Sequence, residues 1–311
     1  MDARGLKIFL ADAASRLVWG LGLTKRDTGN SIPVLCYHRV LPEFVETCAP
    51  IYTILPEQFE AQMAFLAGEG FISLSLPEYA GIAQGSKPAP RRAVLITFDD
   101  GYADNYGIAW PIARKHRITL NLFLCTGLIG ENHPVVMTKH GYVLLKNRRM
   151  PGPDRTDVWE HIQKFPELWR PLNWQELGEM KDAGVHFGFH SHSHRNLARL
   201  PTGELAADLA VGLEMFERRW GYRPRFFAIP YGWHDAYTPE TITTQGQLNL
   251  EFIFGTHLGR ARLPCHQSVL PRLGIYQSDD LASFQRKLFG AYDWLGPLRL
   301  IKHKMLRAQG K

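Results

Sequence analysis

The chain has 311 residues, 45% of them hydrophobic and 12% aromatic, which suits one large α/β domain or two small ones. Its formal net charge is +6, and the basic residues are scattered apart from a group near the C-terminus. This balance excludes a strongly basic nucleic-acid-binding protein and is compatible with an anionic lipid or phosphate as a partner.

Residues 1–30 are predicted to form an amphipathic helix followed by a polar connector. The apolar residues at helical spacing are Leu6, Phe9, Leu10, Ala13, Ala14, Leu17, Val18 and Leu21. Asp12 and Arg16 interrupt this run, so it is too short for a signal peptide or a membrane-spanning helix. Two interpretations stay open, a helix packed on its own domain and a helix on a membrane surface. We expect a cytoplasmic protein, peripheral at the inner membrane face in the second case.

Residues 31–277 are predicted to form a single domain in which strands and helices alternate. Apolar, β-branched and aromatic runs predict buried strands at 32–40, 93–98, 120–125, 185–190, 226–229 and 251–255. Helical patterns occupy 56–70, 104–116, 174–183, 202–220 and 239–245, and a last helix begins near residue 279. This alternation predicts a parallel sheet with helices outside, which a barrel would close naturally.

Two further segments complete the predicted organisation. Residues 130–172 have no clear periodicity and are too long for a simple connector, so we expect them to cap a cleft. Residues 278–311 are expected to form a helical, basic C-terminal tail. Its basic residues are Arg299, Lys302, Lys304, Arg307 and Lys311.

The cysteines suggest a reducing compartment. They are Cys36, Cys48, Cys125 and Cys265, and no two of them form a Cys-x-x-Cys pair. Two lie inside apolar, strand-like runs, so buried free thiols are expected, although the pattern leaves a disulfide open.

Polar residues stand at the ends of several predicted strands. His38 ends the first, Asp99 and Asp100 follow the second, and His190 and His194 follow a later one. Carboxyl ends of parallel strands meet at one edge of a barrel, where functional groups gather. An isolated Asp-Asp-Gly is more typical of a β-turn. Two histidines separated by three residues, however, are a common metal-binding pair, and together these residues predict a metal site.

This constellation predicts a metal-dependent hydrolase. One aspartate and two histidines leave coordination positions open for water and a substrate oxygen. A cation held there lowers the pKa of bound water from 15.7 towards about 7 and polarises a carbonyl. The second carboxylate would deprotonate this water, and His38 could protonate the departing amine. His192, between the two predicted ligands, is expected to point away from the site.

Three sequence runs resemble the signatures of a known family. They are ITFDDGYADNY (residues 96–106), FGFHSHSHRNL (187–197) and AIPYG (228–232). They are similar, in this order, to the first three signatures of the polysaccharide deacetylases, carbohydrate esterase family four, with its NodB-homology domain. The resemblance extends from about residue 32 to residue 273. It implies a distorted (β/α) barrel of about seven parallel strands with outer helices, flanked by N-terminal and C-terminal helices.

The resemblance also implies roles for the strand-end residues. Asp99 would be the catalytic base, and Asp100, His190 and His194 would hold one divalent cation, expected to be Zn²⁺, with Co²⁺, Ni²⁺ or Mn²⁺ as alternatives.

The third signature and the first strand imply the remaining groups. In the turn Pro230-Tyr231-Gly232, the backbone N–H of Tyr231 would help to form the oxyanion hole, where one donor contributes roughly 3–4 kcal/mol. YHRV (residues 37–40) looks like the start of exopolysaccharide deacetylases that carry the acid histidine on the first strand, which implies His38.

The chain departs from the family pattern in two places. The third signature usually begins with an arginine, where this chain has Ala228. In the family this arginine steadies the base. Arg272 is predicted to be a substitute cation near the site and is placed among the oxyanion and substrate-binding residues. The alternative is an arginine at the surface or at the rim of the core. Later family motifs are not recognisable, which leaves His257 and His266 as alternatives for the acid.

The expected function is removal of an N-acetyl group from an amino sugar. The expected substrate is a lipid-linked or nucleotide-linked precursor used in the biosynthesis of surface polysaccharide. A deformylase or an O-acetyl esterase could use the same machinery. A non-catalytic carbohydrate-binding barrel is a further alternative, against which the intact set of acidic and imidazole side chains argues. Candidates for a sugar-binding rim are Trp159, Trp169, Trp174 and Trp233. The sequence indicates no oligomeric state.

Overall fold

A computed structural model of the chain describes residues 3–22, 24, 30–45, 52–138, 141–145 and 156–296. Its helices are α1 (Ala3–Gly20), α2 (Pro56–Gly68), α3 (Leu76–Ala83), α4 (Trp110–Lys115), α5 (Thr156–Lys164), α6 (Pro166–Trp169), α7 (Trp174–Asp182), α8 (Thr202–Trp220), α9 (Pro239–Gln247) and α10 (Leu281–Leu288). Its strands are β1 (Val34–Tyr37), β2 (Arg39–Val40), β3 (Thr53–Ile54), β4 (Ile72–Leu74), β5 (Ala93–Phe98), β6 (Asn121–Leu124), β7 (Val135–Thr138), β8 (Gly141–Leu144), β9 (His186–Phe189), β10 (Phe226–Ala228), β11 (Phe252–Phe254) and β12 (Leu273–Gly274).

The main sheet is parallel and runs in the order β11-β10-β9-β6-β5-β1-β12, with β4 paired to the first half of β5. The chain leading into β12 also pairs with β11. Phe254 and Leu270 form a parallel bridge, and the N–H of Gly255 donates to the carbonyl of Leu270 at 2.9 Å. These bonds join the two ends of the sheet. The predicted distorted barrel of about seven parallel strands with outer helices is therefore confirmed.

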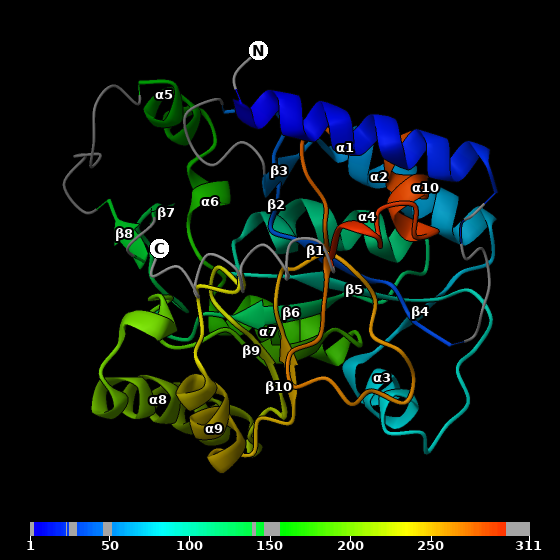
Figure 1. Ribbon diagram of the computed structural model, residues 1–311. Coiled ribbons are helices and arrows are strands. Elements are labelled where there is room, and N and C mark those ends of the chain that lie inside the picture. The colour runs from blue at the N-terminus through cyan, green and yellow to red at the C-terminus, as the bar shows by residue number, and fades with distance from the viewer. Residues whose placement is uncertain are drawn as a thin grey trace.

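Buried side chains fill both faces of the strands. All six residues of β5 are buried, as are all four of β1 and of β6. Such continuously buried, mainly apolar runs are typical of parallel strands covered on both sides. Helices surround the sheet in Figure 1. Helices α2, α4, α8 and α10 pack on one face of the strands, and α3 packs on the other.

The helix predicted at 104–116 begins differently from expectation. A π-helical turn, η2 (Asn105–Ala109), precedes α4, and the N–H of Trp110 donates to the carbonyl of Asn105. Pro111 follows in the first turn of α4 and has no N–H to give. Because proline interrupts the regular hydrogen-bond ladder, the chain takes a wider turn just before it.

The insertion 130–172 has secondary structure and a small core of its own. It contains the antiparallel pair β7–β8 and the helices α5 and α6. Its buried apolar residues pack on the segment after β2. This cluster comprises Leu41, Val45, Val136, Leu145, Val158, Ile162 and Trp169.

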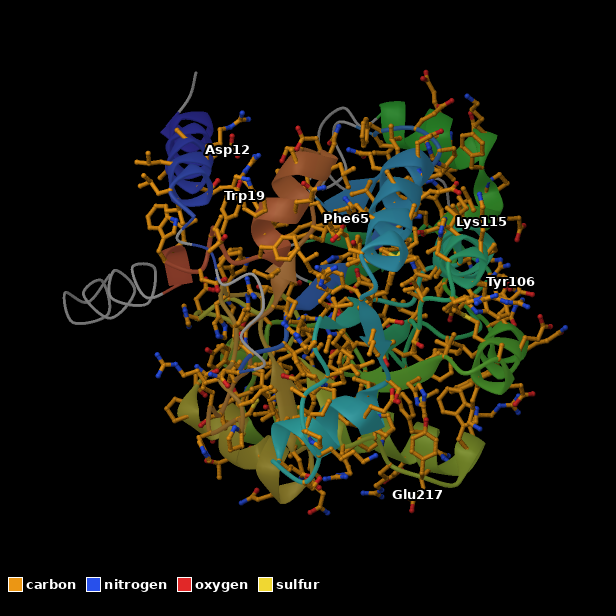
Figure 2. All side chains as sticks on the ribbon, turned by 90° about the vertical axis from the view of Figure 1, so that its right-hand side faces the viewer. Asp12, Trp19, Phe65, Tyr106, Lys115 and Glu217 are labelled. Carbon is orange, nitrogen blue, oxygen red and sulfur yellow. The ribbon has the colours of Figure 1, made fainter. Side chains whose placement is uncertain are left out.

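Helix α1 lies across α10, and the side that packs there is partly polar (Figures 1 and 2). Asp12 accepts hydrogen bonds from Arg286 Nη2 and Tyr292 OH, both at 2.7 Å. The ring of Trp19 lies 5.8 Å from that of Phe289. Of the apolar residues predicted for this segment, Ala13, Leu17 and Leu21 are exposed, whereas Ala14 and Val18 are of intermediate exposure.

The exposed apolar side chains at the end of this helical segment are Leu17, 64% exposed, and Leu21, 63% exposed. No helix within the described ranges combines the length and the hydropathy that a bilayer crossing requires. The basic tail residues from Arg299 onwards and Cys48 lie outside the described residues. Cys36, Cys125 and Cys265 are free thiols, and the first two are buried as expected.

Candidate active site

Turns at the carboxyl edge of the barrel carry the predicted site residues. Asp100, Ser191, His194 and Tyr231 all have left-handed backbone angles, with φ between 52° and 76°. Each follows a strand of the central sheet, either directly or within a few residues. This conformation costs a non-glycine residue roughly 1–3 kcal/mol and persists only where surrounding contacts impose it. The strain is therefore concentrated where the polar side chains converge.

Asp100, His190 and His194 form one buried group. Asp100 Oδ1 lies 3.3 Å from His190 Nε2 and 3.2 Å from His194 Nε2. The three donor atoms all lie within 4.8 Å of one another. Zinc ligands about 2.0–2.2 Å from a tetrahedral ion stand roughly 3.4 Å apart, so this spacing suits a shared cation.

The hydrogen bonds around this group also fit a cation. Asp100 Oδ1 is buried and has no hydrogen-bond partner among the described residues, although both imidazoles approach it. The other nitrogen of His190, Nδ1, is 2.7 Å from the carbonyl of Ala228. This contact makes Nδ1 the donor and leaves the lone pair of Nε2 directed at the aspartate, as in many metal-binding histidines. The donor set thus suits a divalent metal.

Asp99, the adjacent residue, has a different partner. Arg272 Nη1 donates to Asp99 Oδ1 at 2.7 Å and Nη2 donates to Oδ2 at 2.6 Å, and the arginine side chain is fully buried. The Arg272 side chain therefore lies behind the carboxylate of the predicted base, where a substrate cannot reach it. Burial raises the pKa of Asp99, but the charges of Arg272 and His190 outweigh it and hold the pKa below its usual range.

A second group of donor atoms adjoins the first and comprises Cys36, His38 and Asp99. Cys36 Sγ lies 3.6 Å from Asp99 Oδ2, and burial keeps the thiol pKa well above its usual value. The guanidinium of Arg272 already satisfies both oxygens of Asp99. Because its positive charge opposes a cation there, the group containing Asp100 is the better metal site.

His38 lies beside Asp99 and is partly accessible. Its Nε2 is 3.9 Å from Asp99 Oδ2, and 16% of its side chain is exposed compared with 1% for Asp99. Burial lowers its pKa below the usual histidine value, and the two neighbouring aspartates oppose that effect. Asn105 Nδ2 donates to the His38 carbonyl at 3.0 Å and fixes the backbone at this position.

Arg39 and Asp104 hold the segment that carries His38, and sequence reasoning missed both. Asp104 accepts from Arg39 Nε at 3.1 Å and from the backbone N–H of Val40 at 2.7 Å. The Arg39 guanidinium lies between the rings of Tyr102 and Trp169, 4.0 and 4.2 Å from their centroids. Trp169, a candidate rim residue, is therefore a buried support. Arg39 directly follows His38, and Asp104 follows Asp100 by four positions. This closeness to site residues was the sequence signal that could have identified them.

The loop after β9 is fixed from outside the site. His192 Nδ1 lies 3.1 Å from Thr126 Oγ1, and the His192 N–H donates to Asp208 Oδ2 at 3.1 Å. Ser191 Oγ accepts from the His194 N–H at 2.9 Å. The His192 side chain thus points away from Asp100. The hydrogen bond from the His194 N–H to Ser191 helps to orient His194 towards Asp100.

The Pro230-Tyr231-Gly232 turn lies against His194. The rings of Tyr231 and His194 are 5.0 Å apart, and Thr256 Oγ1 donates to the Tyr231 carbonyl at 2.8 Å. Gly232 has φ +64°, and a Cβ there would lie 2.6 Å from Thr256. Only glycine fits this close approach, which holds the predicted oxyanion turn in place.

The alternative acids lie in other surroundings. The ring of His257 is 5.1 Å from that of His234, and burial together with the charge of His234 lowers its pKa to about 4. His266 is exposed, on a segment that bonds to the end of α3. Neither belongs to the groups of donor atoms around Asp99 and Asp100.

The fold is a (β/α) barrel whose strand ends carry a donor set that suits a metal, and sequence comparison identifies the family. A sequence model of the polysaccharide deacetylase family matches residues 86–253, more than half of the chain. The chain belongs to the polysaccharide deacetylases. Members of this carbohydrate esterase family depend on a metal and hydrolyse amide bonds, so the predicted family and enzyme class are confirmed.

Two curated relatives illustrate the range of the match. YxkH of Bacillus subtilis, named provisionally as a polysaccharide deacetylase, is 22% identical over 76% of this chain and 68% of its own length. The poly-β-1,6-N-acetyl-D-glucosamine N-deacetylase of Staphylococcus aureus is 29% identical over 42% of this chain. The matched part spans about half (47%) of the staphylococcal protein.

Known structures share the fold. The Streptococcus pyogenes deacetylase PplD, in complex with acetate, has a TM-score of 0.65 at 20% identity and covers 84% of this chain and 99% of its own. IcaB from Ammonifex degensii has a TM-score of 0.64 at 22% identity, covering 85% and 98%. At these identities the likeness concerns the barrel alone.

Proposed function

We propose that this polysaccharide deacetylase removes the N-acetyl group of an amino sugar. Asp100, His190 and His194 would hold a divalent cation, Asp99 would be the base and His38 the acid. The observation that carries the proposal is the contrast between the two aspartates. One faces two imidazoles with an unsatisfied oxygen, and the other is held beside them by an arginine.

A cation in this site would supply Lewis-acid chemistry, polarising the acetamido carbonyl and making a water molecule acidic enough to react near neutral pH. We propose Zn²⁺, because two imidazoles and one carboxylate are among its usual ligands. Co²⁺, Ni²⁺ and Mn²⁺ accept the same donors and stay as alternatives.

Asp99 would take the proton from the attacking water. Its two oxygens are oriented by the fork of Arg272, which keeps the carboxylate ionised and fixed in direction. A base must be within hydrogen-bond reach of the proton that it removes, and Asp99 directly precedes the proposed ligand Asp100.

His38 and the Tyr231 turn would act on the departing group and on the oxyanion. His38 is the partly exposed neighbour of Asp99, so that a leaving amine can approach it from the solvent side. Gly232 and Thr256 hold the turn in which the N–H of Tyr231 would donate to the developing negative charge.

The substrate proposal is an N-acetylated amino sugar. The staphylococcal relatives are named for a β-1,6-linked N-acetylglucosamine polymer, which supports this sugar class. The finer prediction, a lipid-linked or nucleotide-linked precursor, stays a prediction. A deformylase or an O-acetyl esterase would need the same donor atoms, and the acyl group therefore has to be tested directly.

The test is a release assay on the purified, metal-loaded protein. We expect acetate from β-1,6-linked N-acetylglucosamine oligomers or from a lipid-linked or nucleotide-linked N-acetylamino sugar, and its rate identifies the better substrate. Formate released from N-formyl sugars, or acetate released only from O-acetylated sugars, would favour one of the other hydrolases. No release from any of these substrates would favour a non-catalytic binding protein.

We also propose a peripheral position on an anionic membrane at the cytoplasmic face. Helix α1 is anchored through Asp12 and Trp19, whereas Leu17 and, just after the helix, Leu21 are exposed. Arg16 pairs with Asp12, and 65% of its side chain is exposed. Exposed leucines beside a basic residue, on a chain of net charge +6, suit the surface of an anionic bilayer.

A further inference from the structure

Two tyrosines stand next to His38 and are not explained by the proposed chemistry. The ring of Tyr52 lies 4.6 Å from that of His38, and the ring of Tyr276 lies 6.0 Å from that of Tyr52. All three side chains are of intermediate exposure, whereas Asp99, Asp100, His190 and His194 are buried. Tyr52 and Tyr276, which we call the aromatic wall, therefore adjoin the site on the side of the proposed acid.

The extended segment at β12 directs Tyr276 towards the site. Arg272, Gly274 and Tyr276 alternate along it and so share one side. Arg272 bonds Asp99, and Gly274 pairs with Cys36, whose thiol also contacts Asp99. A Cβ at position 274 would lie 2.4 Å from the Tyr276 hydroxyl, so this ring folds back over the glycine towards the same group.

A buried lysine fixes the Tyr276 ring. The ammonium of Lys287 is 4.5 Å from the ring centroid and is itself held by Asp279 Oδ2 at 2.5 Å and the Gly274 carbonyl at 2.8 Å. The backbone N–H of Tyr276 donates to the same Asp279 at 2.7 Å. Lys287 thus contacts the ring, and the bond to Asp279 holds the backbone that carries it, before any ligand arrives. This is the preorganisation that a binding surface needs.

The connectivity of the substrate indicates which of its groups would lie against Tyr52 and Tyr276. The acyl carbon is attacked beside Asp99, and the amide nitrogen must face the acid that protonates it. The sugar ring is bonded to that nitrogen and therefore lies on the His38 side, while the methyl group of the acyl lies away from it. We propose that Tyr52 and Tyr276 form the binding surface for the pyranose ring of the amino sugar. This inference rests on the proposed function.

The test compares sugar binding with turnover in the full-length, metal-loaded protein. Calorimetry with a β-1,6-linked glucosamine oligomer, the deacetylated product, measures sugar binding without hydrolysis. Tyr52→Ala, Tyr52→Leu and Tyr276→Ala should each raise the Kd about tenfold, which corresponds to about 1.4 kcal/mol. They should raise KM for the N-acetylated oligomer more than they lower kcat. Tyr52→Phe keeps the aromatic face and should bind within about twofold of the wild type.

Tyr222 provides the matched control. It is 38% exposed and lies between α8 and β10, at the amino edge of the barrel opposite the site. Tyr222→Ala should leave the Kd unchanged. Equal affinity of the wild type, Tyr52→Ala and Tyr276→Ala, with thermal unfolding confirming that all are folded, would overturn the inference. Failure of the wild type to release any acyl group would instead reject the proposed function, and the calorimetric comparison would still decide whether the wall binds sugar.

Discussion

Asp99 and Asp100 are neighbours in the sequence, yet they face different partners. The left-handed backbone of Asp100, with φ 76°, turns its side chain towards the two histidines while that of Asp99 meets Arg272. Burial raises the pKa of Asp100, but the imidazole of His194 and the other close histidines bring it well below the usual value. Two like charges can share this edge because each has its own compensating group.

Removing Arg272 should lower the stability of the folded protein, because Asp99 would stay buried without a compensating charge. Arg272→Leu leaves the buried Asp99 carboxylate without its partner, which typically lowers the free energy of unfolding by about 3–5 kcal/mol. Urea denaturation measures the loss. Arg223→Ala breaks an exposed pair with Glu217, labelled in Figure 2, and should cost no more than about 1 kcal/mol. Equal losses in the two variants would show that the Arg272 pair is not an important support.

At the scale of elements, long buried segments could be predicted and short ones could not. Strand β5 has the predicted limits because its six buried residues, all apolar except Thr97, are bounded by turn residues. Helix α8 also matches, with Gly221 ending it at φ 73°. Strands β4 and β12 have three and two residues, too few to show a period, and α3 was missed beside them. The position of Arg272 depends on β12, so the sequence could suggest it as a substitute for the family arginine but could not give its hydrogen bonds to Asp99.

The docking of α1 was open in the sequence and is settled for its described side chains by Asp12. Polar residues of an amphipathic helix are expected on the solvent side. Here Arg286 and Tyr292 on the body of the protein supply donors, so that a carboxylate becomes the inward anchor. An isolated helix pattern does not reveal such distant partners.

Acid should release α1. Burial raises the pKa of Asp12, but hydrogen bonds from Tyr292, Arg16 and Arg286 lower it overall from 3.8 to about 2. A lowered folded pKa means that the stabilisation is complete above about pH 4 and is lost as the pH falls towards 2. Because the Asp12 side chain is 30% exposed, we expect roughly 1 kcal/mol.

The measurement is proteolysis by pepsin across this pH range, with cleavage sites read by mass spectrometry. Cleavage near Leu17 should increase below about pH 4 in the wild type. In Asp12→Asn it should already be fast at pH 4, and Glu78→Gln, whose carboxylate caps α3, serves as the control. Identical pH profiles for the wild type and Asp12→Asn would contradict the anchor.

At the scale of the whole molecule, the barrel closes through the segment before β12, and α1 lies outside it. Closure brings Arg272 from the last strand to Asp99 on a central one, 173 residues apart in the sequence. The motifs predicted which residues meet at the metal group because they follow strands of one parallel sheet. The absence of the family arginine at Ala228 pointed to Arg272 as a substitute cation, but the sequence could not show that barrel closure pairs it with both oxygens of Asp99.

The membrane proposal is tested with the intact protein. Wild type should co-sediment with phosphatidylserine-containing vesicles at low salt, and Leu17→Asp with Leu21→Asp should reduce the bound fraction several-fold, because both exposed leucines become charged. Val211→Asp changes an apolar residue of α8 that is 41% exposed and should have no effect. A wild type that stays entirely in the supernatant would reject the proposal.

The central claim is that Asp100, His190 and His194 bind one cation while Asp99 acts as the catalytic base. Elemental analysis of the purified wild type, Asp99→Asn and Asp100→Ala, combined with acetate release, tests it most directly. We expect one divalent ion per chain in the wild type, the ion retained without activity in Asp99→Asn, and the ion lost in Asp100→Ala. An Asp100→Ala protein that keeps the ion and the activity would contradict the account.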